Sequence, residues 1–599
     1  MTETTTAAPG TGVPHAQRTI ARLWRDGIAA RRSNPAYLVE GENGWREVSW
    51  ADADERIREY ANGFLARGIG KSDAVAILAQ TSLDWVFLDF ALAHVGAVVI
   101  PIYASSSTRD VAYLLGHSDA VGIVCEDAGQ REKVDEVAAE LPALRELLSF
   151  DDLDELAAAG RRYAETHPTA LDDAISALAE DDLYTIIYTS GTTGPPKGCM
   201  ISHRNYHAMA TTVDSMDSFL HDDDLMLLYL PLAHNFGKLM MLEGAHAGFT
   251  IALLSDPLRV ADALLEVRPT VLPSVPRVYE KIHSAVVARF DAETGLRKRI
   301  VDWSLPVGRE VARLRVEGKP VPRILALRHA VADRLVFAKV RARLGGRLRT
   351  PISGGAPLSR EVAHFFDGMG IRLIEGYGLT ECTTACTTNR PDLNRFGTVG
   401  TPLPSAEVRI AEDGEILVRG ETVFQGYYKD PEATAATFTA DGWLKTGDVG
   451  SIDEDGFLTI TDRKKDIIVT AGGKNVAPQN IENDLKASKY VSQALVVGDR
   501  RPYVAALITL DAAELGRWAA ERGLDGDLAT LARDPQVAEL VQGIVDGVNE
   551  SRSRYEQIKR FVLLSRDFTL DEGELTPTLK VRRPACVEHF QAEVEQLYA

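Results

Sequence analysis

Hydrophobic positions along the first ~400 residues alternate between helical spacing and short apolar runs. The clearest helix is expected over residues 49–70, where Ile57 and Phe64 share one apolar face with residues between them. Short apolar runs at 73–79 and 121–125 indicate buried strands that follow helices. Helices that alternate with such strands predict an α/β fold in which the helices cover largely parallel sheets.

The most apolar stretch, residues 85–104, predicts a buried helix followed by a buried strand. Asp89, His94 and Pro101 lie within it and are poorly compatible with a membrane span. An Arg-rich, mostly helical segment at 284–345 is expected to form a solvated outer layer. Further buried strands are expected at 182–190, 226–234 and 270–276, and units in which a strand leads into a loop are expected at 349–358 and 371–381.

The pattern changes after about residue 400, where strand-rich hairpins replace the alternation. Residues 407–420 predict a hairpin that turns at Asp413-Gly414, and residues 491–510 predict another. The charged segment "DRKKD" at 462–466 is the expected domain boundary. The chain is therefore divided into a disordered tail (1–17), a large domain (18–464) and a small C-terminal domain (465–599).

Composition and charge narrow the class of protein. A chain of 599 residues exceeds one hydrophobic core, which agrees with several domains. The net charge of −20 argues against a general nucleic-acid binder. Five scattered cysteines indicate reduced thiols in the cytoplasm, and the N-terminus has neither the basic nor the apolar region of a signal peptide.

The segment "YTSGTTGPPKG" (188–198) follows an expected strand and has the composition of a phosphate-binding loop. Its glycines let the backbone turn and direct N–H groups at an anion, its hydroxyls add donors, and Lys197 adds a positive charge. A Walker loop is excluded because Gly198, not Ser or Thr, follows the lysine. A mobile linker is the competing interpretation, but it needs no buried strand before it.

With the other motifs in view, the chain resembles the adenylate-forming superfamily of acyl-CoA synthetases, peptide-synthetase adenylation domains and luciferases. Within it, the chain looks most like the bacterial long-chain fatty-acid–CoA ligases. The motifs occur in the family's order: "YTSGTTGPPKG" (188–198), "SGGAPL" (353–358), "EGYGLTE" (375–381), "GYYKDPEAT" (426–434), "WLKTGD" (443–448), "DRKKDIIVTAGGKNVAPQNIE" (462–482) and "ELTPTLKVRR" (574–583).

This resemblance implies a fold and a reaction. The expected fold is α/β, with a large N-terminal adenylate-forming domain of α/β sandwich subdomains plus a β-barrel-like subdomain, and a small mobile α+β C-terminal domain. The expected substrates are a fatty acid, ATP and coenzyme A, with Mg²⁺. The carboxylate would attack the α-phosphate to give acyl-AMP and pyrophosphate, and the coenzyme A thiol would then displace AMP.

The resemblance also assigns residues to the nucleotide. Tyr377 would face adenine, Asp448 would accept hydrogen bonds from both ribose hydroxyls, and Arg463 would contact ribose or phosphate. The whole ATP- and AMP-binding set implied is Thr189, Ser190, Gly191, Thr192, Thr193, Gly194, Lys197, Gly355, Ala356, Pro357, Gly376, Tyr377, Gly378, Thr380, Asp448, Arg463 and Lys580.

The remaining roles implied by the resemblance concern catalysis, metal and movement. Lys580 is the expected catalytic lysine, with Thr192 and His234 also assigned to catalysis. Glu381 and Thr192 are the expected Mg²⁺ ligands, since a hard cation prefers oxygen. Lys465 is the expected hinge. Gly472, Gly473 and Lys474 are expected to lie at the coenzyme A tunnel.

Substrate and acceptor are left open by the sequence. Lys238, Glu243 and His246 follow His234, near a wall that the resemblance expects to be mostly apolar, so chain length and acyl type are not fixed. A carrier-protein phosphopantetheine arm is an alternative acceptor, and a non-catalytic nucleotide-binding scaffold is a second rival. An amphipathic substrate would favour peripheral contact with a membrane, no anchor is visible, and monomer and homodimer remain open.

Overall fold

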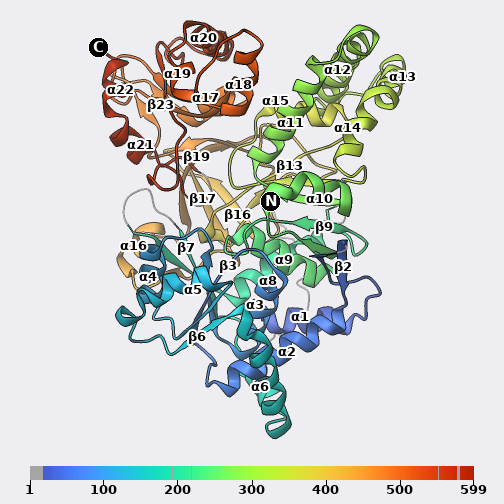
Figure 1. Ribbon diagram of the computed structural model, residues 1–599, viewed down its shortest axis with the longest axis vertical. Coiled ribbons are helices and arrows are strands. Elements are labelled where there is room, and N and C mark those ends of the chain that lie inside the picture. The colour runs from blue at the N-terminus through green and yellow to red at the C-terminus, as the bar shows by residue number, and fades with distance from the viewer. Residues whose placement is uncertain (1–17, 43, 190–194, 217–218, 551, 577–579) are drawn as a thin grey trace, which may run out of the picture.

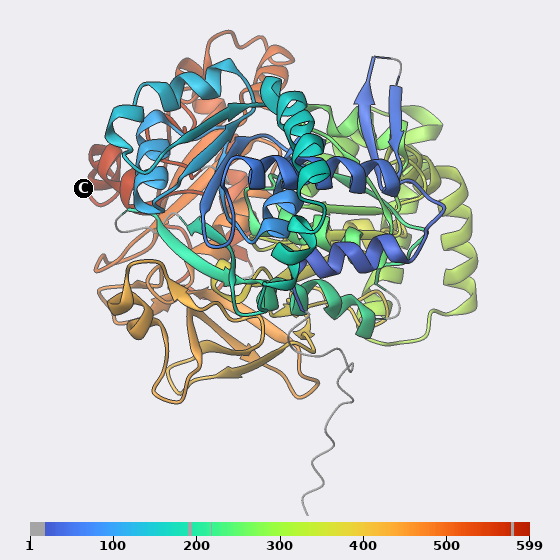
Figure 2. The ribbon, with the colours of Figure 1, turned by 90° about the horizontal axis from the view of Figure 1, so that it is seen from below.

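The computed structural model describes residues 18–42, 44–189, 195–216, 219–550, 552–576 and 580–599. Two large mixed sheets and their helices make up the N-terminal part, and a smaller unit of helices and strands lies at one end of the molecule (Figure 1). Seen from below, the blue-to-cyan N-terminal region, the green region after it and the orange strands after residue 400 lie around a common centre (Figure 2).

The first large sheet has seven strands in the order β18-β8-β7-β4-β3-β5-β6. Strands β3, β4, β5, β6 and β7 pair parallel with one another, whereas β8 pairs antiparallel with both β7 and β18. Its strands are β3 (Ala74–Ala79), β4 (Val98–Tyr103), β5 (Gly122–Cys125), β6 (Glu146–Ser149), β7 (Leu183–Thr189), β8 (Lys197–Ser202) and β18 (Gly426–Tyr427).

The second large sheet has nine strands in the order β15-β14-β13-β12-β11-β9-β10-β1-β2, parallel from β13 to β1. Its strands are β1 (Tyr37–Gly41), β2 (Gly44–Val48), β9 (Leu225–Leu228), β10 (Thr250–Leu253), β11 (Val271–Ser274), β12 (Thr350–Ser353), β13 (Ile374–Tyr377), β14 (Thr387–Thr388) and β15 (Thr401–Pro402). The largely parallel α/β architecture expected from the sequence is therefore confirmed.

The helices of this part pack on the sheets or form the outer layer. They are α1 (Ile20–Ala29), α2 (Trp50–Ala66), α3 (Leu83–Val95), α4 (Thr108–His117), α5 (Ala128–Asp135), α6 (Leu153–Thr166), α7 (Ala170–Ser176), α8 (His203–Thr211), α9 (Asn235–Ala247), α10 (Val260–Val267), α11 (Pro276–Asp291), α12 (Gly295–Val316), α13 (Arg323–Ala332), α14 (Ala338–Arg343), α15 (Arg360–Gly368) and α16 (Pro431–Thr437). In the described part of the chain, no helix is both long and apolar enough to cross a bilayer.

The region expected to be barrel-like is a four-stranded antiparallel sheet. Its order is β16-β17-β19-β20, with β16 (Ala406–Ile410), β17 (Glu415–Gly420), β19 (Leu444–Ile452) and β20 (Leu458–Arg463). The predicted turn at Asp413-Gly414 is confirmed between β16 and β17, and Gly414 takes the positive φ of +85° that favours glycine there.

Beyond Lys465 the chain builds a separate core. Side chains from Ile468 onward pack on one another, while the large N-terminal cluster ends with Leu458 and Ile460. Its elements are β21 (Ile468–Val469), β22 (Asn475–Val476), α17 (Pro478–Lys486), β23 (Val491–Val497), β24 (Ala505–Leu510), α18 (Ala512–Ala520), α19 (Leu528–Leu531), α20 (Pro535–Glu550), β25 (Phe561–Leu563), α21 (Arg583–His589) and α22 (Gln591–Gln596).

One expected strand is shorter than its apolar run. Residues 226–234 were expected to be a single strand, but β9 ends at Leu228. Pro231 has no N–H for a ladder, so the chain leaves the sheet and leads to α9 instead. The prediction over 226–234 is therefore wrong beyond Leu228, and the departure delivers His234 to the start of α9.

Lys238 and Asp89 form an ion pair with 0% of either side chain exposed. The ammonium of Lys238 (on α9) donates to Asp89 Oδ1 (on α3) and lies 4.3 Å from the centre of the Tyr184 ring. The Tyr184 hydroxyl donates to the other carboxylate oxygen. Burial lowers the pKa of Lys238, and Asp89 opposes that shift. Lys238 thus belongs to the core between α9, α3 and β7.

We predict that Lys238→Met destabilises the protein by about 3–5 kcal/mol, because the Asp89 carboxylate is left buried without its cation. The measurement is the unfolding midpoint in urea and on heating. The double variant Asp89→Asn/Lys238→Met should recover part of the loss, since both charges are gone. Lys319→Met, at an exposed lysine, is the control; a loss for Lys238→Met no larger than that of the control would contradict the prediction.

Candidate active site

Asp448 lies at the meeting point of three elements and is only 6% exposed. The Tyr377 hydroxyl at the end of β13 donates to its Oδ2 at 2.7 Å. Arg463 pairs with Asp448 across β19 and β20, and its Nε lies 3.4 Å from Oδ1. Burial raises the pKa of Asp448, and the Arg463 charge and the Tyr377 hydrogen bond act against that rise. The carboxylate is thus buried, oriented and partly neutralised.

Lys580, in the C-terminal unit, lies near the same carboxylate. Its carbonyl oxygen accepts a hydrogen bond from Thr576 N–H at 2.8 Å. The pKa of Lys580 is lowered to about 8 by the protein around it and by Arg463, while Asp448 raises it. Lys580, Asp448 and Arg463 thus lie close enough for each charge to affect the others.

His234 is the third group within reach of Lys580. It caps α9, where its Nδ1 accepts a hydrogen bond from Phe236 N–H at 3.1 Å, so the proton of the neutral ring is on Nε2. Burial, assisted by the Lys580 charge, lowers the pKa of His234 to about 3. The imidazole is therefore neutral at physiological pH.

Tyr427 lies between the expected Mg²⁺ ligand and the expected phosphate-binding segment. The Tyr427 hydroxyl donates to Glu381 Oε1 at 2.7 Å. The Lys197 ammonium lies 4.9 Å from the centre of the Tyr427 ring and 3.8 Å from Asp430 Oδ2. Tyr427 thus links Glu381 to the lysine of the glycine- and threonine-rich segment. Sequence reasoning gave Tyr427 no role, although its "GYYKDPEAT" motif was recognised.

A cleft of about 350 Å³ opens beside these groups. This volume is in the range of small-molecule sites. Lys445 and Lys464 enter the cleft from the antiparallel sheet and were also missed by sequence reasoning. The lining residues are Leu379, Glu381, Glu415, Tyr427, Ala436, Thr437, Lys445, Thr446, Gly447 and Lys464.

Glu381 suits a magnesium ion that takes most of its ligands from phosphate and water. Among the described residues, no group of three or more His, Cys, Asp or Glu could hold a metal by itself. A single carboxylate fits Mg²⁺, which is bound by one or two carboxylates plus substrate phosphates. Tyr427 orients this carboxylate while leaving it a further oxygen. The other expected ligand, Thr192, lies outside the described residues.

The phosphate segment connects β7 to β8, which pair through Thr189 and Lys197. Tyr113 donates to Pro196 O at 2.9 Å and holds the end of the segment. A strand therefore follows the segment, in contrast to the helix that follows a Walker loop. Its central residues, Ser190, Gly191, Thr192, Thr193 and Gly194, lie outside the described residues.

Gly378, which was expected to make room for adenine, is needed for a contact within the protein itself. A Cβ at Gly378 would lie 2.0 Å from Thr384 O, so Gly378 is required by the protein's own backbone. A Cβ at Gly376 would come within 3.3 Å of Thr388 Oγ1. Gly355 takes a φ of +82° and has open space, with Ala356 and Pro357 directly after it. Thr380 begins the short 3₁₀ turn that carries Glu381.

The expected coenzyme A residues form the tight turn between β21 and β22. Gly473 takes a φ of +71°, and its N–H donates to Thr470 O at 2.8 Å. Gly472 precedes it, and the Lys474 ammonium lies 5.9 Å from the centre of the Tyr555 ring. In the described part of the chain, no hydrogen bond joins this turn to Asp448, so the structure does not bring the two sets together.

The hinge expected at Lys465 lies between β20 and β21. The pKa of Lys465 is lowered by its protein surroundings and by Arg463. On either side of it, Gln479 N–H donates to Asp462 Oδ2 at 3.2 Å, and Asn480 donates to Thr461 O at 3.1 Å. These bonds cross the expected boundary and hold the pose in which Lys580 faces Asp448.

One basic residue near Lys580 has a structural role. Arg583 follows Lys580 by three residues, and its guanidinium donates to Glu482 Oε1 at 2.8 Å and to Val496 O at 2.7 Å. Arg583 thus fixes the segment after Lys580 to α17 and β23 within the C-terminal unit.

Comparison with known proteins agrees with this geometry. Residues 25–428 match the family model of the AMP-binding enzymes, and residues 465–599 match the AMP-binding enzyme C-terminal domain. The long-chain-fatty-acid–CoA ligase FadD15 of Mycobacterium bovis is 40% identical over 96% of this chain and 97% of its own length. Human long-chain-fatty-acid–CoA ligase 1 is 32% identical over 88% of this chain and 78% of its own.

Solved structures have the same fold. ATP-bound MatB from Rhodopseudomonas palustris superposes with a TM-score of 0.67 at 25% identity and covers 95% of this chain and 99% of its own. The adenylation domain of a carboxylate reductase from Mycobacterium chelonae gives a TM-score of 0.74 over 98% and 91%; its 24% identity supports the fold alone. The resemblance read from the motifs is confirmed, and the chain belongs to the family of AMP-binding enzymes.

Proposed function

We propose that the protein ligates a long-chain fatty acid to coenzyme A at the expense of ATP, through an acyl-adenylate, with release of AMP and pyrophosphate. The observation that carries this proposal is the proximity of the Lys580 charge to Asp448 and His234, which come from three separate parts of the chain. Relatives named long-chain-fatty-acid–CoA ligase, at 40% and 32% identity, support the substrate class.

In the first step, a fatty carboxylate oxygen attacks the α-phosphorus and the bond from that phosphorus to pyrophosphate breaks. Two anions must approach each other, so positive charge at the reacting centre lowers the barrier. Lys580 supplies that charge next to Asp448, whose carboxylate would accept hydrogen bonds from the ribose hydroxyls. Tyr377 and Arg463 hold the carboxylate in place for this task.

Glu381 would hold Mg²⁺, which when bound neutralises phosphate charge. Tyr427 fixes the orientation of Glu381, and Lys197 lies on the face of the Tyr427 ring, at the end of the phosphate segment. The neutral His234 ring would separate the phosphate and acyl parts of the site without a proton transfer.

In the second step, the thiol sulfur of coenzyme A attacks the acyl carbon, the bond from that carbon to the AMP oxygen breaks, and the thiol proton is lost. We assign Gly472, Gly473 and Lys474 to coenzyme A in a second pose. Reaching it from the present pose requires rotation near Lys465 and loss of the Asp462–Gln479 and Thr461–Asn480 hydrogen bonds.

We predict that Lys580→Ala lowers adenylation at least about 100-fold, because a charge on the developing transition state is removed. Thioester formation from supplied acyl-AMP should be nearly unchanged. The measurement is exchange of labelled pyrophosphate into ATP, beside the release of AMP from acyl-AMP and coenzyme A. Lys474→Ala is the matched control and should impair the second reaction only. Equal loss in both half-reactions for Lys580→Ala would contradict its role.

We predict that kcat/KM for pyrophosphate exchange falls as pH rises through about 8. Because the pKa of Lys580 is lowered, its charged form is abundant below pH 8 and is lost above it. His234, with a pKa near 3, should add no limb between about pH 6 and about pH 8. Lys580→Arg keeps the charge and should move the alkaline limb upward; an active arginine variant with the same break near pH 8 refutes the assignment.

We predict that Tyr427→Phe raises the Mg²⁺ concentration needed for half-maximal exchange about tenfold, because Glu381 loses the hydroxyl that orients it. Exchange is measured over a series of free Mg²⁺ concentrations at fixed ATP. The neighbouring Tyr428→Phe is the control, since its hydroxyl lies 3.3 Å from Asp119 and not at Glu381. Identical Mg²⁺ curves for the two variants would rule out this role.

A further inference from the structure

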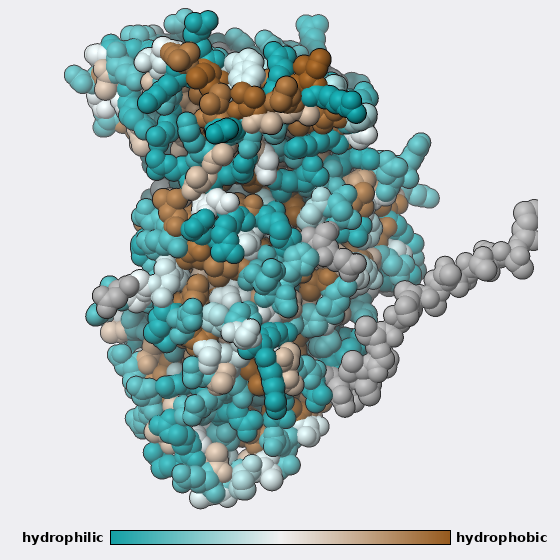
Figure 3. All heavy atoms as spheres, turned by 90° about the vertical axis from the view of Figure 1, so that its right-hand side faces the viewer, coloured by the Kyte–Doolittle hydropathy of each residue, from teal (hydrophilic) through white to brown (hydrophobic). Residues whose placement is uncertain are grey.

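The helix α13 and the π-helical turn after it, η6 (Asp333–Phe337), carry an apolar stripe that the described chain leaves uncovered. Ile324 is 77% exposed, Leu327 69%, Val331 45% and Leu335 39%. Their spacing puts them on one helical face. Figure 3 shows the side of the molecule on which α13 lies, with apolar atoms gathered at its upper end among hydrophilic ones.

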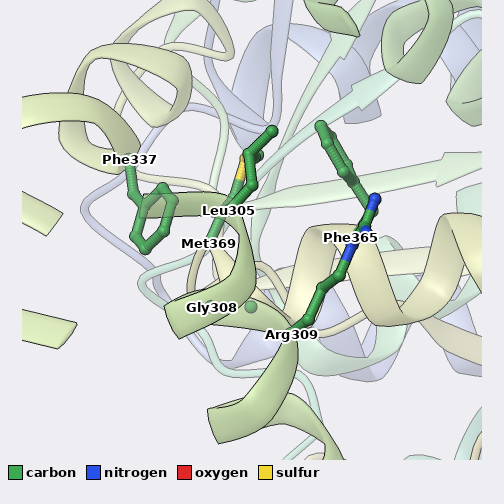
Figure 4. Close-up of a pocket in the computed structure, with 7 residues that line it drawn as sticks. Leu305, Gly308, Arg309, Phe337, Phe365 and Met369 are labelled. Atoms are coloured by element: carbon green, nitrogen blue, oxygen red, sulfur yellow. The ribbon is translucent and has the colours of Figure 1, made fainter. Parts of the chain in front are cut away.

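The opposite face of the same segment is firmly packed. Ala332 and Phe337 are 0% exposed, and the Phe337 ring lies against Gly308 of α12 (Figure 4). His329 and Gly368 O, on α15, lie 2.9 Å apart through a ring nitrogen. A small cavity of about 10 Å³ between α12, α15 and η6 leaves no room for another side chain. The outer stripe is therefore presented by an anchored helix, not by a loose one.

The stripe lies in the most basic part of the chain. Residues 295–349 contain 15 Lys and Arg against four Asp and Glu, a local net charge of +11 in a chain whose net charge is −20. The four acidic side chains already have cationic partners. They are Asp302 with Lys298, Glu310 with Arg313, Glu317 with Lys319 and Asp333 with Arg341.

Three arginines border the stripe itself. Arg323 and Arg334 lie on one side of it along the helix, and Arg328 lies on the other. None of the three forms an ion pair with any residue that the structure describes, and all are exposed. A face that combines apolar side chains with unneutralised guanidinium groups calls for a partner that is both apolar and anionic.

We propose that the face formed by Ile324, Leu327, Val331, Leu335, Arg323, Arg328 and Arg334 docks on the surface of an anionic phospholipid bilayer. Phosphate groups of such a surface complement the arginines, and the acyl boundary accepts the apolar stripe of a helix that lies in the plane. The α12–α13 pair stands out at one end of the molecule (Figure 1), so the stripe can approach a flat surface. This docking does not depend on the proposed reaction.

The experiment is co-sedimentation of the full chain with vesicles of phosphatidylcholine alone or with about one-third phosphatidylglycerol. We expect binding to the anionic vesicles that weakens with added salt. Ile324→Gln/Leu327→Gln and, separately, Arg323→Gln/Arg328→Gln/Arg334→Gln should each weaken binding at least about tenfold. In the wild type, hydrogen exchange over residues 323–335 should slow when anionic vesicles are present, which tests the face without any substitution.

Matched controls lie elsewhere on the surface. Leu258→Gln removes a leucine that is 92% exposed, and Arg500→Gln removes an arginine that is 92% exposed. Both should bind anionic vesicles as the wild type does, and all variants should keep the unfolding midpoint. The proposal is overturned if anionic vesicles bind no better than neutral ones, if the controls lose as much binding, or if the stripe variants only dissociate a dimer of the chain.

Discussion

The buried carboxylate of Asp448 is the constraint on which the arrangement of the two halves depends. A carboxylate that is 6% exposed is costly unless charge and hydrogen bonds compensate it. Tyr377 and Arg463 provide permanent compensation from β13 and β20, and Lys580 provides a third, conditional part from the C-terminal unit. Because Asp448 raises the pKa of Lys580 and Lys580 lowers that of Asp448, each charge stabilises the other.

That mutual dependence connects the pose of the C-terminal unit to the chemistry. With Lys580 in place, its charge lies near the Asp448 carboxylate, and the cleft that contains Glu381 is lined by Thr446 and Gly447, directly before Asp448. Ribose hydroxyls bound to Asp448 would satisfy the carboxylate by hydrogen bonds and make it less dependent on Lys580. Adenylate formation would then free Lys580 to leave, and only Asp462–Gln479, Thr461–Asn480 and similar boundary contacts would remain to be broken.

Helices and turns that are determined by neighbouring residues could be predicted from the sequence. Contacts between residues far apart in the chain could not. The helix over 49–70 is confirmed as α2 because its cap, Ser49, is a neighbour: Asp52 N–H donates to Ser49 Oγ at 3.1 Å. Lys238 could not be placed, because its partner Asp89 lies 149 residues away. Gly378 was given to the nucleotide, whereas its backbone neighbour Thr384 forbids a side chain. The roles of motif residues such as Lys580 and Asp448 were expected from the resemblance to a known family. The spacing of residues along the chain did not predict them.

The charge distribution explains how an acidic chain can attract anions both at the active-site cleft and at residues 295–349. Outside residues 295–349 the chain carries a net charge of −31, so an anionic surface repels most of the molecule. At physiological salt the field of each region decays within about 8 Å, and a contact therefore responds to local charge and not to the total. Lys445 and Lys464 line the cleft beside Glu381, and Arg463 and Lys580 lie near Asp448. Residues 295–349 hold 15 basic side chains against four acidic ones. An anionic surface would repel the acidic regions of the molecule and attract residues 295–349. The uneven charge would therefore also orient the molecule on that surface.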